Sequence, residues 1–272
     1  MKPAAFDYIR ADSTKEVLDL LGEYGDDARI LAGGQSLMAA LNMRLTQPRV
    51  LIDISRINEL SRIRVSGSAL TVGAAVTQAA LEAIVLHQNN TQLLAQIFPH
   101  LGHFQTRNRG TVCGSIAHAD PSAELPLCLA TLGGTVTLRS RRRRRSLPAR
   151  DFFQGVLTTA READEIIESV QFPLADKQTR YGFQEVSMRH GDFAIAAVSA
   201  AVSDRGIRLG VGGVADRPWV EDIPARSGSD LDAALDDLAW KLGAQDDQHA
   251  SARYRRHLVR TLGRKLIVGL SG

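Results

Sequence analysis

The chain has 272 residues, of which 44% are hydrophobic and 23% are charged, and its formal net charge is +3. This is the composition of a globular protein, and the length allows one large domain or two to three small ones. No apolar run is long enough to predict a transmembrane helix, and the N-terminus lacks the apolar core of a secretory signal. With only two cysteines, Cys113 and Cys128, neither a disulfide framework nor a four-ligand zinc site is expected, so we predict a cytoplasmic protein.

The first fifty-odd residues have the pattern of an α/β unit. Ser13 to Glu16 forms a capping box, and apolar residues at helical spacing continue from it to Gly25. A short strand at 29–31 leads through two adjacent glycines into a helix at 36–44, and a buried strand follows at 49–54. We therefore expect a first subdomain over residues 1–55.

A second subdomain is expected over residues 56–176. Strands at 62–65 and 69–72 flank a hairpin turn, and Thr77 is the predicted cap of a helix that ends near Leu86. The remaining elements predicted for this unit are helices at 92–98 and 126–132 and strands at 135–138 and 165–172. Residues 102–120 show no clean period, so we predict no regular element there.

Residues 177–272 are expected to form a C-terminal domain. Strands at 181–188, 195–203 and 207–211 predict a three-stranded antiparallel sheet. Two helices follow, each with an apolar stripe that we expect to be core. The stripes consist of Leu231, Leu235, Leu238 and Leu242 in the first helix and Tyr254, Leu258, Leu262 and Leu266 in the second.

Residues Arg141 to Arg145 form an unbroken arginine run that accounts for most of the excess charge. A strand precedes the run and Ser146 to Pro148 closes it, which favours the tip of a solvated hairpin. Contact with another subunit or an anion is the second interpretation. Nucleic-acid binding is the weakest, because no aromatic residues interleave with the arginines, and we expect none.

Two glycine-bearing segments carry the functional signal. In the segment LAGGQSL, residues 31–37, paired glycines stand between a strand and a helix, where backbone N–H groups suit a phosphate. In residues 106–124, Gly110 and Gly114 bracket a tight passage, and Glu124 could accept both hydroxyls of a ribose. Together, the two segments would suit a dinucleotide with a central pyrophosphate. Neither a Rossmann fingerprint nor a P-loop motif is present.

With AGGQSL followed by TRNRGTVCGSIAHADPSAELP, the chain resembles the FAD-binding medium subunit of molybdenum hydroxylases. That family includes carbon monoxide dehydrogenase medium chains and the flavin domain of xanthine dehydrogenase. The segments MKPAAFDYIRADS, RVLIDISRINEL and RYGFQEVSMRHGDFAIAAVSAAV extend the resemblance over nearly the whole chain. It implies an α/β plus α+β fold, with a two-subdomain FAD-binding fold of the PCMH/VAO type and a C-terminal domain of three strands and helices.

The resemblance also implies the cofactor-binding residues. Gln35 stands where many relatives have histidine, and Cys113 replaces the first glycine of the second loop, which is usually T-I-G-G. If that position needs a positive φ, cysteine is disfavoured; otherwise the thiol only narrows the room near the phosphates. The expected cofactor-binding residues are Leu31, Ala32, Gly33, Gly34, Gln35, Ser36, Leu37, Gly110, Thr111, Gly114, Ser115, His118, Glu124, Ile166, Ile167 and Phe193.

By the same resemblance, the chain would bind FAD noncovalently and receive electrons for an external acceptor. A large molybdopterin subunit and a small subunit with two [2Fe–2S] clusters would be its partners, as a dimer of heterotrimers. Two cysteines cannot supply the four ligands of such a cluster, so those ligands would lie on another chain. We expect no catalytic residue and no metal site in this chain. The alternatives are a self-contained FAD-dependent oxidoreductase and a scaffold subunit without FAD.

Overall fold

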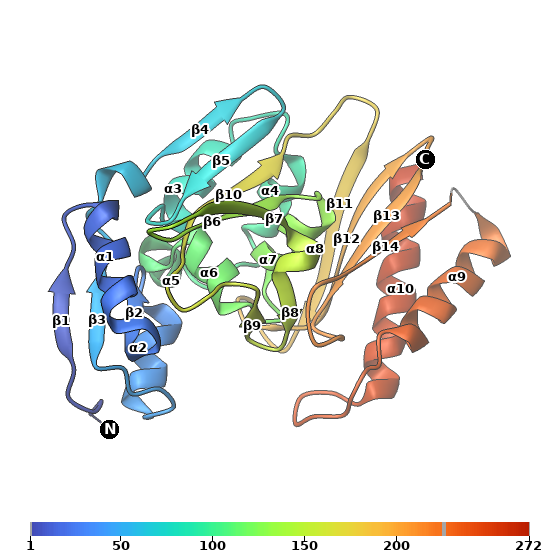
Figure 1. Cartoon of the computed structure of the whole chain (residues 1–272). Helices are drawn as coiled ribbons and strands as arrows, with labels where there is room; N and C mark the ends of the chain where they lie inside the picture. The colour runs from blue at the N-terminus through green and yellow to red at the C-terminus, as the bar shows by residue number, and fades with distance from the viewer. Residues whose placement is uncertain (1, 225–226, 272) are drawn as a thin grey trace.

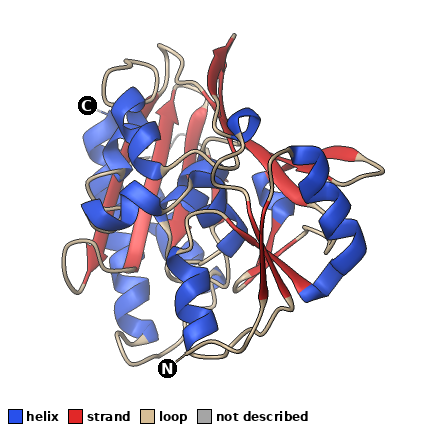
Figure 2. Cartoon of the chain, turned by 90° about the vertical axis from the view of Figure 1, so that its left-hand side faces the viewer, coloured by secondary structure: helices blue, strands red, loops and turns tan. Residues whose placement is uncertain are grey.

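The computed structural model describes residues 2–224 and 227–271. Its elements form three successive units, each built around its own sheet (Figure 1). Figure 2, viewed from the side of the N-terminal unit, shows helices packed against strands throughout the chain. Within the described residues, no helix has the length and apolarity to cross a membrane. The same residues contain no group of three or more His, Cys, Asp or Glu side chains that could hold a metal ion.

The N-terminal unit is a parallel sheet in the order β1-β3-β2. Strand β1 has no counterpart in the sequence prediction, because three of its four residues are exposed and no apolar run marks it. Ser13 is confirmed as the cap of α1, since its hydroxyl accepts the N–H of Glu16 at 3.2 Å. The elements are β1 (Asp7–Arg10), α1 (Thr14–Tyr24), η1 (Gly25–Asp27), β2 (Ala28–Leu31), α2 (Gln35–Asn42) and β3 (Val50–Asp53).

The middle unit contains a five-stranded antiparallel sheet in the order β4-β5-β10-β6-β7. Residues 102–120 contain two helices, α5 and α6, which are too short for a 3.6-residue period to show in the sequence. The elements are η2 (Asn58–Leu60), β4 (Ile63–Ser66), β5 (Ala69–Gly73), α3 (Gln78–Val85), α4 (Gln92–Ile97), α5 (Phe104–Arg109), α6 (Val112–His118), α7 (Glu124–Thr131), β6 (Thr135–Arg139), β7 (Arg144–Pro148), α8 (Ala149–Phe152), β8 (Phe153–Gly155), β9 (Thr158–Thr159) and β10 (Ile166–Pro173).

The C-terminal unit has a four-stranded antiparallel sheet, so the expectation of three strands was wrong. The fourth strand lies at the edge of the sheet, and its acidic residues Glu221 and Asp222 hide the alternation that would have marked it. The elements are β11 (Arg180–Ser187), β12 (Ala194–Ser203), β13 (Gly206–Gly212), β14 (Trp219–Ile223), α9 (Gly228–Lys241) and α10 (Ala252–Ser271).

Helices α9 and α10 pack on one face of the C-terminal sheet, and α7 of the middle unit packs on the other (Figure 1). The leucine stripe of α9 is buried as predicted. The stripe of α10 was only partly right, because Tyr254 is 43% exposed and Leu262 is half-buried. A strict four-residue spacing drifts around a helix of 3.6 residues per turn. The buried face of α10 consists instead of Arg255, Leu258, Val259, Gly263, Leu266 and Ile267.

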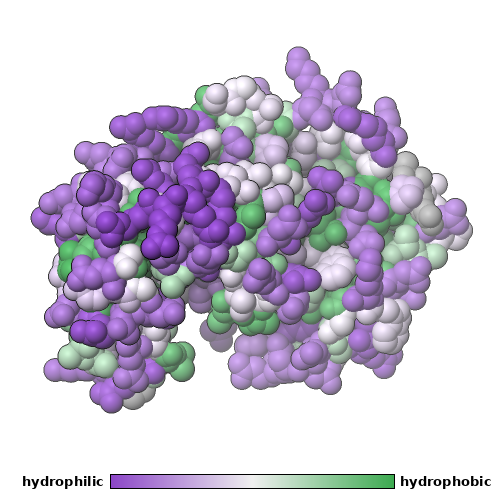
Figure 3. Space-filling view, viewed as in Figure 1, coloured by the Kyte–Doolittle hydropathy of each residue, from purple (hydrophilic) through white to green (hydrophobic). Residues whose placement is uncertain are grey.

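The arginine run forms the tip of the β6–β7 hairpin, as predicted, on a strongly hydrophilic area of the surface (Figure 3). Arg144 and Arg145 also belong to its second strand, which the prediction did not include. Most of its guanidinium groups are paired with acids. Arg145 donates to both carboxylate oxygens of Glu165, at 2.8 and 2.7 Å, and that glutamate side chain is fully buried. Arg144 pairs with Glu168 at 2.6 Å, and Arg141 pairs with Asp19 at 3.1 Å. The arginines therefore tie the hairpin to its neighbours.

Candidate functional site

A cavity of about 1270 Å³ lies where the three units meet. Leu31 does not line it: this side chain packs beneath the loop, where a Cβ added to Gly34 would lie 3.2 Å from its Cδ1. All the other predicted cofactor-binding residues line the cavity. They are Ala32, Gly33, Gly34, Gln35, Ser36, Leu37, Gly110, Thr111, Gly114, Ser115, His118, Glu124, Ile166, Ile167 and Phe193.

The first loop leads from β2 into α2 through a left-handed turn. Gly34 has φ +73°, a backbone conformation that residues with a side chain rarely adopt. It immediately precedes α2, and no side chain caps the free N–H groups of that helix. The side-chain amide of Gln35 donates to the backbone carbonyl of Gly33 at 3.2 Å, which stiffens the turn. The start of α2 therefore offers uncapped N–H donors beside the cavity.

The second loop is anchored on both sides before α6 begins. The N–H of Gln78 donates to the carbonyl of Gly110 at 2.8 Å, and Val112 donates to Val76 at 3.1 Å. The hydroxyl oxygen of Thr111 accepts the N–H of Gly114 at 3.0 Å and so caps α6. A Cβ at Gly114 would lie 2.6 Å from that oxygen, which explains the glycine.

The two loops touch each other through their backbones. A Cβ added to Gly33 would lie 2.3 Å from the carbonyl oxygen of Arg109 and 2.7 Å from the Cα of Gly110. Neither atom belongs to a side chain that could rotate away. Glycine at position 33 is therefore required by the contact between the loops, which together form one continuous wall.

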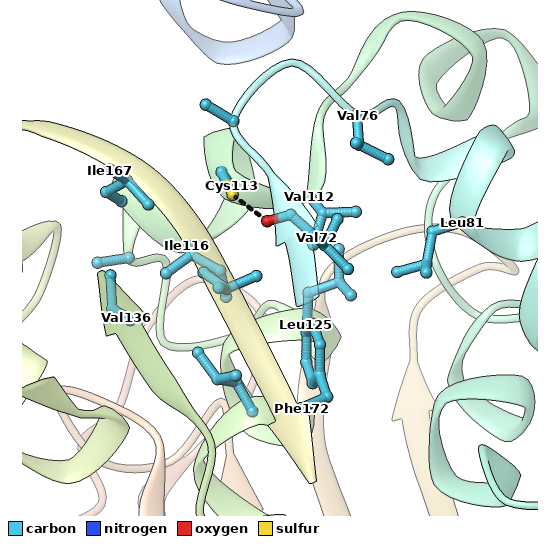
Figure 4. Packing of buried hydrophobic residues seen from close by; sticks show 14 of the residues in the cluster. Val72, Val76, Leu81, Val112, Cys113, Ile116, Leu125, Val136, Ile167 and Phe172 are labelled. Atoms are coloured by element: carbon cyan, nitrogen blue, oxygen red, sulfur yellow. Dashed lines mark hydrogen bonds between the residues drawn. The ribbon is translucent and has the colours of Figure 1, made fainter. Parts of the chain in front are cut away.

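Cys113 lies in the first turn of α6, where the backbone is helical and φ is not positive. Glycine is therefore not required at this position. The residue is 3% exposed, and its thiol donates to the carbonyl of Val72 at 3.5 Å (Figure 4). Burial raises the pKa of this thiol to about 12, so it stays protonated. Cys113 thus packs into the core below the second loop.

Glu124 is the first residue of α7 and is only 7% exposed. Burial, and to a lesser extent the nearby charges of Glu185 and Asp120, raises the pKa of its carboxyl to about 8. His118 ends α6 and is half-buried in the cavity wall. Hydrogen-bond donors around the Glu124 carboxyl would therefore be needed to lower the free-energy cost of its ionised form.

Part of the cavity lining is apolar. Ile166 and Ile167 begin β10 and are almost completely buried. Phe193 lies in the loop between β11 and β12 and is 66% exposed, with Met188 of the same loop equally open. Leu157, at the turn between β8 and β9, adopts φ +53° and donates its N–H to Ala119 at 3.2 Å. These side chains give the cavity apolar surface of the kind that ring systems bind.

The family model described as "FAD binding domain in molybdopterin dehydrogenase" matches residues 4–175. The chain belongs to this family. It is 36% identical to the 6-hydroxypseudooxynicotine dehydrogenase complex subunit alpha of Paenarthrobacter nicotinovorans, over 96% of this chain and 93% of the relative. It is 29% identical to the carbon monoxide dehydrogenase medium chain of Afipia carboxidovorans, over 98% and 97% respectively.

Solved structures of relatives share the fold over the full length. Quinoline 2-oxidoreductase from Pseudomonas putida 86 superposes with a TM-score of 0.91 at 32% identity, covering 100% of this chain and 98% of that one. A carbon monoxide dehydrogenase from Hydrogenophaga pseudoflava superposes with a TM-score of 0.92 at 29% identity, covering 99% and 98%. The mixed helix-and-sheet architecture is therefore that of the molybdopterin-dehydrogenase FAD proteins.

The cavity suits the cofactor of this FAD-binding family. FAD joins a doubly charged pyrophosphate to a ribose, a sugar alcohol chain and two flat ring systems. Uncapped N–H groups at α2 and the guanidinium groups of Arg29 and Arg161, which also line the cavity, would stabilise negative charge. Glu124 supplies a carboxyl for hydroxyl groups, and the isoleucine pair supplies an apolar surface. The residues that line the cavity therefore fit the chemical groups of FAD.

Sequence reasoning predicted only Phe193 from the C-terminal unit and missed the rest of the wall that this unit contributes. The guanidinium of Arg255 reaches from α10 and donates to the carbonyls of Ile195 at 2.6 Å and Gly213 at 2.5 Å, and to Asp247 at 2.5 Å. All four residues line the cavity. Nothing in the sequence distinguishes Arg255 from its neighbouring arginines. Arg29 and Arg161 were also missed, because one lies in a strand and the other in a loop without a motif.

Proposed function

We propose that this chain is the FAD-carrying electron-transfer subunit of a heteromeric molybdenum-containing hydroxylase or dehydrogenase. FAD, when bound, supplies the redox chemistry, taking electrons from a partner's [2Fe–2S] clusters and delivering them to an external acceptor. The observation that carries the proposal is the wall formed by the two glycine loops, joined at Gly33 and continuous with the uncapped start of α2. The chain's own residues bind and orient the cofactor.

The proposed roles of the residues follow the walls that they line. Residues 31–37 and the second loop with Gly110, Thr111, Gly114 and Ser115 would enclose the pyrophosphate, with Leu31 acting from below through Gly34. Glu124 would accept the ribose hydroxyls, with His118 beside the cofactor. The apolar residues Ile166, Ile167 and Phe193 would cover its ring systems.

The burial of both cysteines supports the assignment of the iron–sulfur clusters to a partner subunit. Cys113 and Cys128 are both buried, and burial raises the pKa of each thiol, so neither offers a thiolate for a metal cluster. We therefore assign the [2Fe–2S] clusters to a small partner subunit and molybdopterin to a large one, in a dimer of heterotrimers. The names of the relatives, which include a dehydrogenase complex subunit and a medium chain, agree with this assignment.

We also propose the division into residues 1–55, 56–176 and 177–272, with the first two units forming a two-subdomain FAD-binding fold of the PCMH/VAO type. It is supported by the three main sheets, since β1 to β3, β4 to β10 and β11 to β14 each fall within one of these ranges. The matched family range, 4–175, ends close to the second boundary.

Purification of the chain with its native partners tests the proposal. We expect oxidised-flavin absorption and a stable complex with a molybdopterin chain and a cysteine-rich chain. Organic-substrate turnover by the isolated chain would instead favour a self-contained FAD-dependent oxidoreductase. A stable complex without flavin bands, even after addition of FAD, would favour the scaffold alternative.

A further inference from the structure

The side chain of Arg255 binds backbone carbonyls at two irregular points of the C-terminal sheet. The register of β11 with β12 skips Ile195, as in a β-bulge. The ladder between β12 and β13 ends at Gly212, one residue before Gly213. Nη1 of Arg255 donates to the carbonyl oxygens of Ile195 at 2.6 Å and Gly213 at 2.5 Å. The guanidinium thus holds together two strands where their regular pairing stops.

Gly213 connects this anchor to the middle unit. Its N–H donates to the carbonyl of Pro121 at 2.8 Å, across the boundary between the two units. A Cβ at Gly213 would lie 2.7 Å from the carbonyl oxygen of Ala194, and φ is +76°, so glycine is required here. Hydrogen bonds therefore form a continuous path from the guanidinium of Arg255 through Gly213 to Pro121.

Pro121 belongs to the short segment that leads into Glu124. The side chain of Asp120 accepts the N–H of Ser122 at 2.8 Å, and its carbonyl accepts that of Ala123 at 3.1 Å. The segment is therefore a tight turn, and all of these residues line the cavity. Glu124 follows directly as the first residue of α7. A displacement of Pro121 would reach Glu124 through only three residues of this turn.

A third hydrogen bond fixes the direction of the guanidinium. Nη2 of Arg255 donates to Oδ2 of Asp247 at 2.5 Å. Oδ1 of the same carboxylate accepts the N–H groups of His249 at 2.8 Å and Ala250 at 2.9 Å, which holds it in place. Arg255 is only 6% exposed. Because a guanidinium is planar and its donors point in fixed directions, a lysine could not bind the same three acceptors in this geometry.

We propose that Arg255 is a positioning residue for FAD, which holds the segment 120–124 through Gly213 so that Glu124 can accept the ribose hydroxyls of the cofactor. This rests on the proposed role of Glu124. Arg255 acts through the backbone path and needs no contact with FAD. The affinity for the ribose is then set partly by α10, which lies outside the matched family range of 4–175.

A double-mutant cycle in FAD affinity tests the coupling. Fluorescence titration of the apoprotein gives Kd for the wild type, Arg255→Lys, Glu124→Gln and the double variant. We expect Arg255→Lys to raise Kd by about tenfold or more, since hydrogen bonds to a charged group are lost. In the Arg255→Lys background, the rise in Kd caused by Glu124→Gln should be smaller by at least about threefold. Arg253→Lys, on the exposed side of the same helix, is the matched control and should be additive with Glu124→Gln.

The ribose itself gives a readout that a general loss of stability would not change. FAD is compared with an analogue whose adenosine ribose lacks the 2′-hydroxyl. We expect the wild type to prefer FAD and Arg255→Lys to show a smaller preference. Asp247→Asn keeps the arginine but places an amide beside it, so it should reduce the preference as well. This second variant tests the path even if Arg255→Lys does not fold.

The outcomes separate the proposal from the proposed function. The proposal is overturned if Glu124→Gln raises Kd by the same factor in both backgrounds, or if neither Arg255→Lys nor Asp247→Asn changes the preference for the ribose hydroxyl. An unchanged Kd in the single variant Glu124→Gln would overturn the proposal together with the assigned role of Glu124. Failure of the wild-type apoprotein to bind FAD would instead overturn the proposed function.

Discussion

Gly33→Ala tests the contact between the two loops. The new Cβ would lie 2.3 Å from a backbone oxygen and 2.7 Å from a backbone carbon, whereas real Cβ atoms almost never approach closer than 3.0 Å. The loops must therefore separate by about 1 Å, and overpacking of this kind costs about 1–3 kcal/mol. Because Gly33 does not have a positive φ, the cost is entirely steric. We expect Tm to fall by about 2–10 °C.

The same variant should weaken FAD binding, because the separated loops must close again around the ligand. A penalty of about 1–3 kcal/mol corresponds to a rise in Kd of about 5- to 150-fold. Fluorescence titration of the apoprotein with FAD measures it. Gly269→Ala is the control, since a Cβ there meets nothing within 4 Å. Unchanged Kd and Tm in Gly33→Ala would refute the inferred contact.

Four other outcomes are expected. Gly34→Val should abolish FAD binding, since a β-branched residue is strained at φ +73° and crowds Leu31; full flavin occupancy would contradict this. Cys113→Gly should keep FAD but melt earlier, because glycine costs about 1 kcal/mol within a helix; loss of FAD would assign the thiol a specific role. Arg145→Ala should cost about 3 kcal/mol by leaving buried Glu165 poorly paired, whereas Arg142→Ala should change Tm little; equal effects in thermal melts would argue against the ion-pair account. The apoprotein should lose stability as pH rises from about 5 to 8, because folded Glu124 keeps its proton up to a pKa of about 8 while the unfolded carboxyl has lost it; Glu124→Gln should flatten the slope of Tm against pH.

The sequence predicted the parts of the site where backbone geometry restricts the residue type. Position 34 has a positive φ, and position 33 contacts the backbone of the second loop. Both positions therefore favour glycine, which can be recognised in the sequence. Apart from Phe193, the C-terminal part of the wall was not predicted, because Ile195 and Gly213 contribute backbone carbonyls, which any residue carries. Which cavity residues contact the cofactor stays a prediction.

The same contrast applies to the fold. The hairpin at β4 and β5 and the Thr77 cap were predicted because turn and cap positions select particular residue types. Edge strands β1 and β14 were missed, since an exposed strand does not require apolar alternation. Helices α5 and α6 are shorter than two full turns, so tertiary contacts and not a repeated apolar spacing define them.

Because Arg255 connects α10 to the cavity wall, retention of the cofactor would report on the packing of all three units. This side chain joins the last helix to the wall of the cavity that Ala32 also lines, so distant segments of the chain would meet at a bound FAD. A ligand that binds only this assembled arrangement adds its binding free energy to that of folding. The ratio of flavin to protein absorbance would therefore decrease in any variant that weakens the packing of α10, even where the substituted residue lies far from the glycine loops.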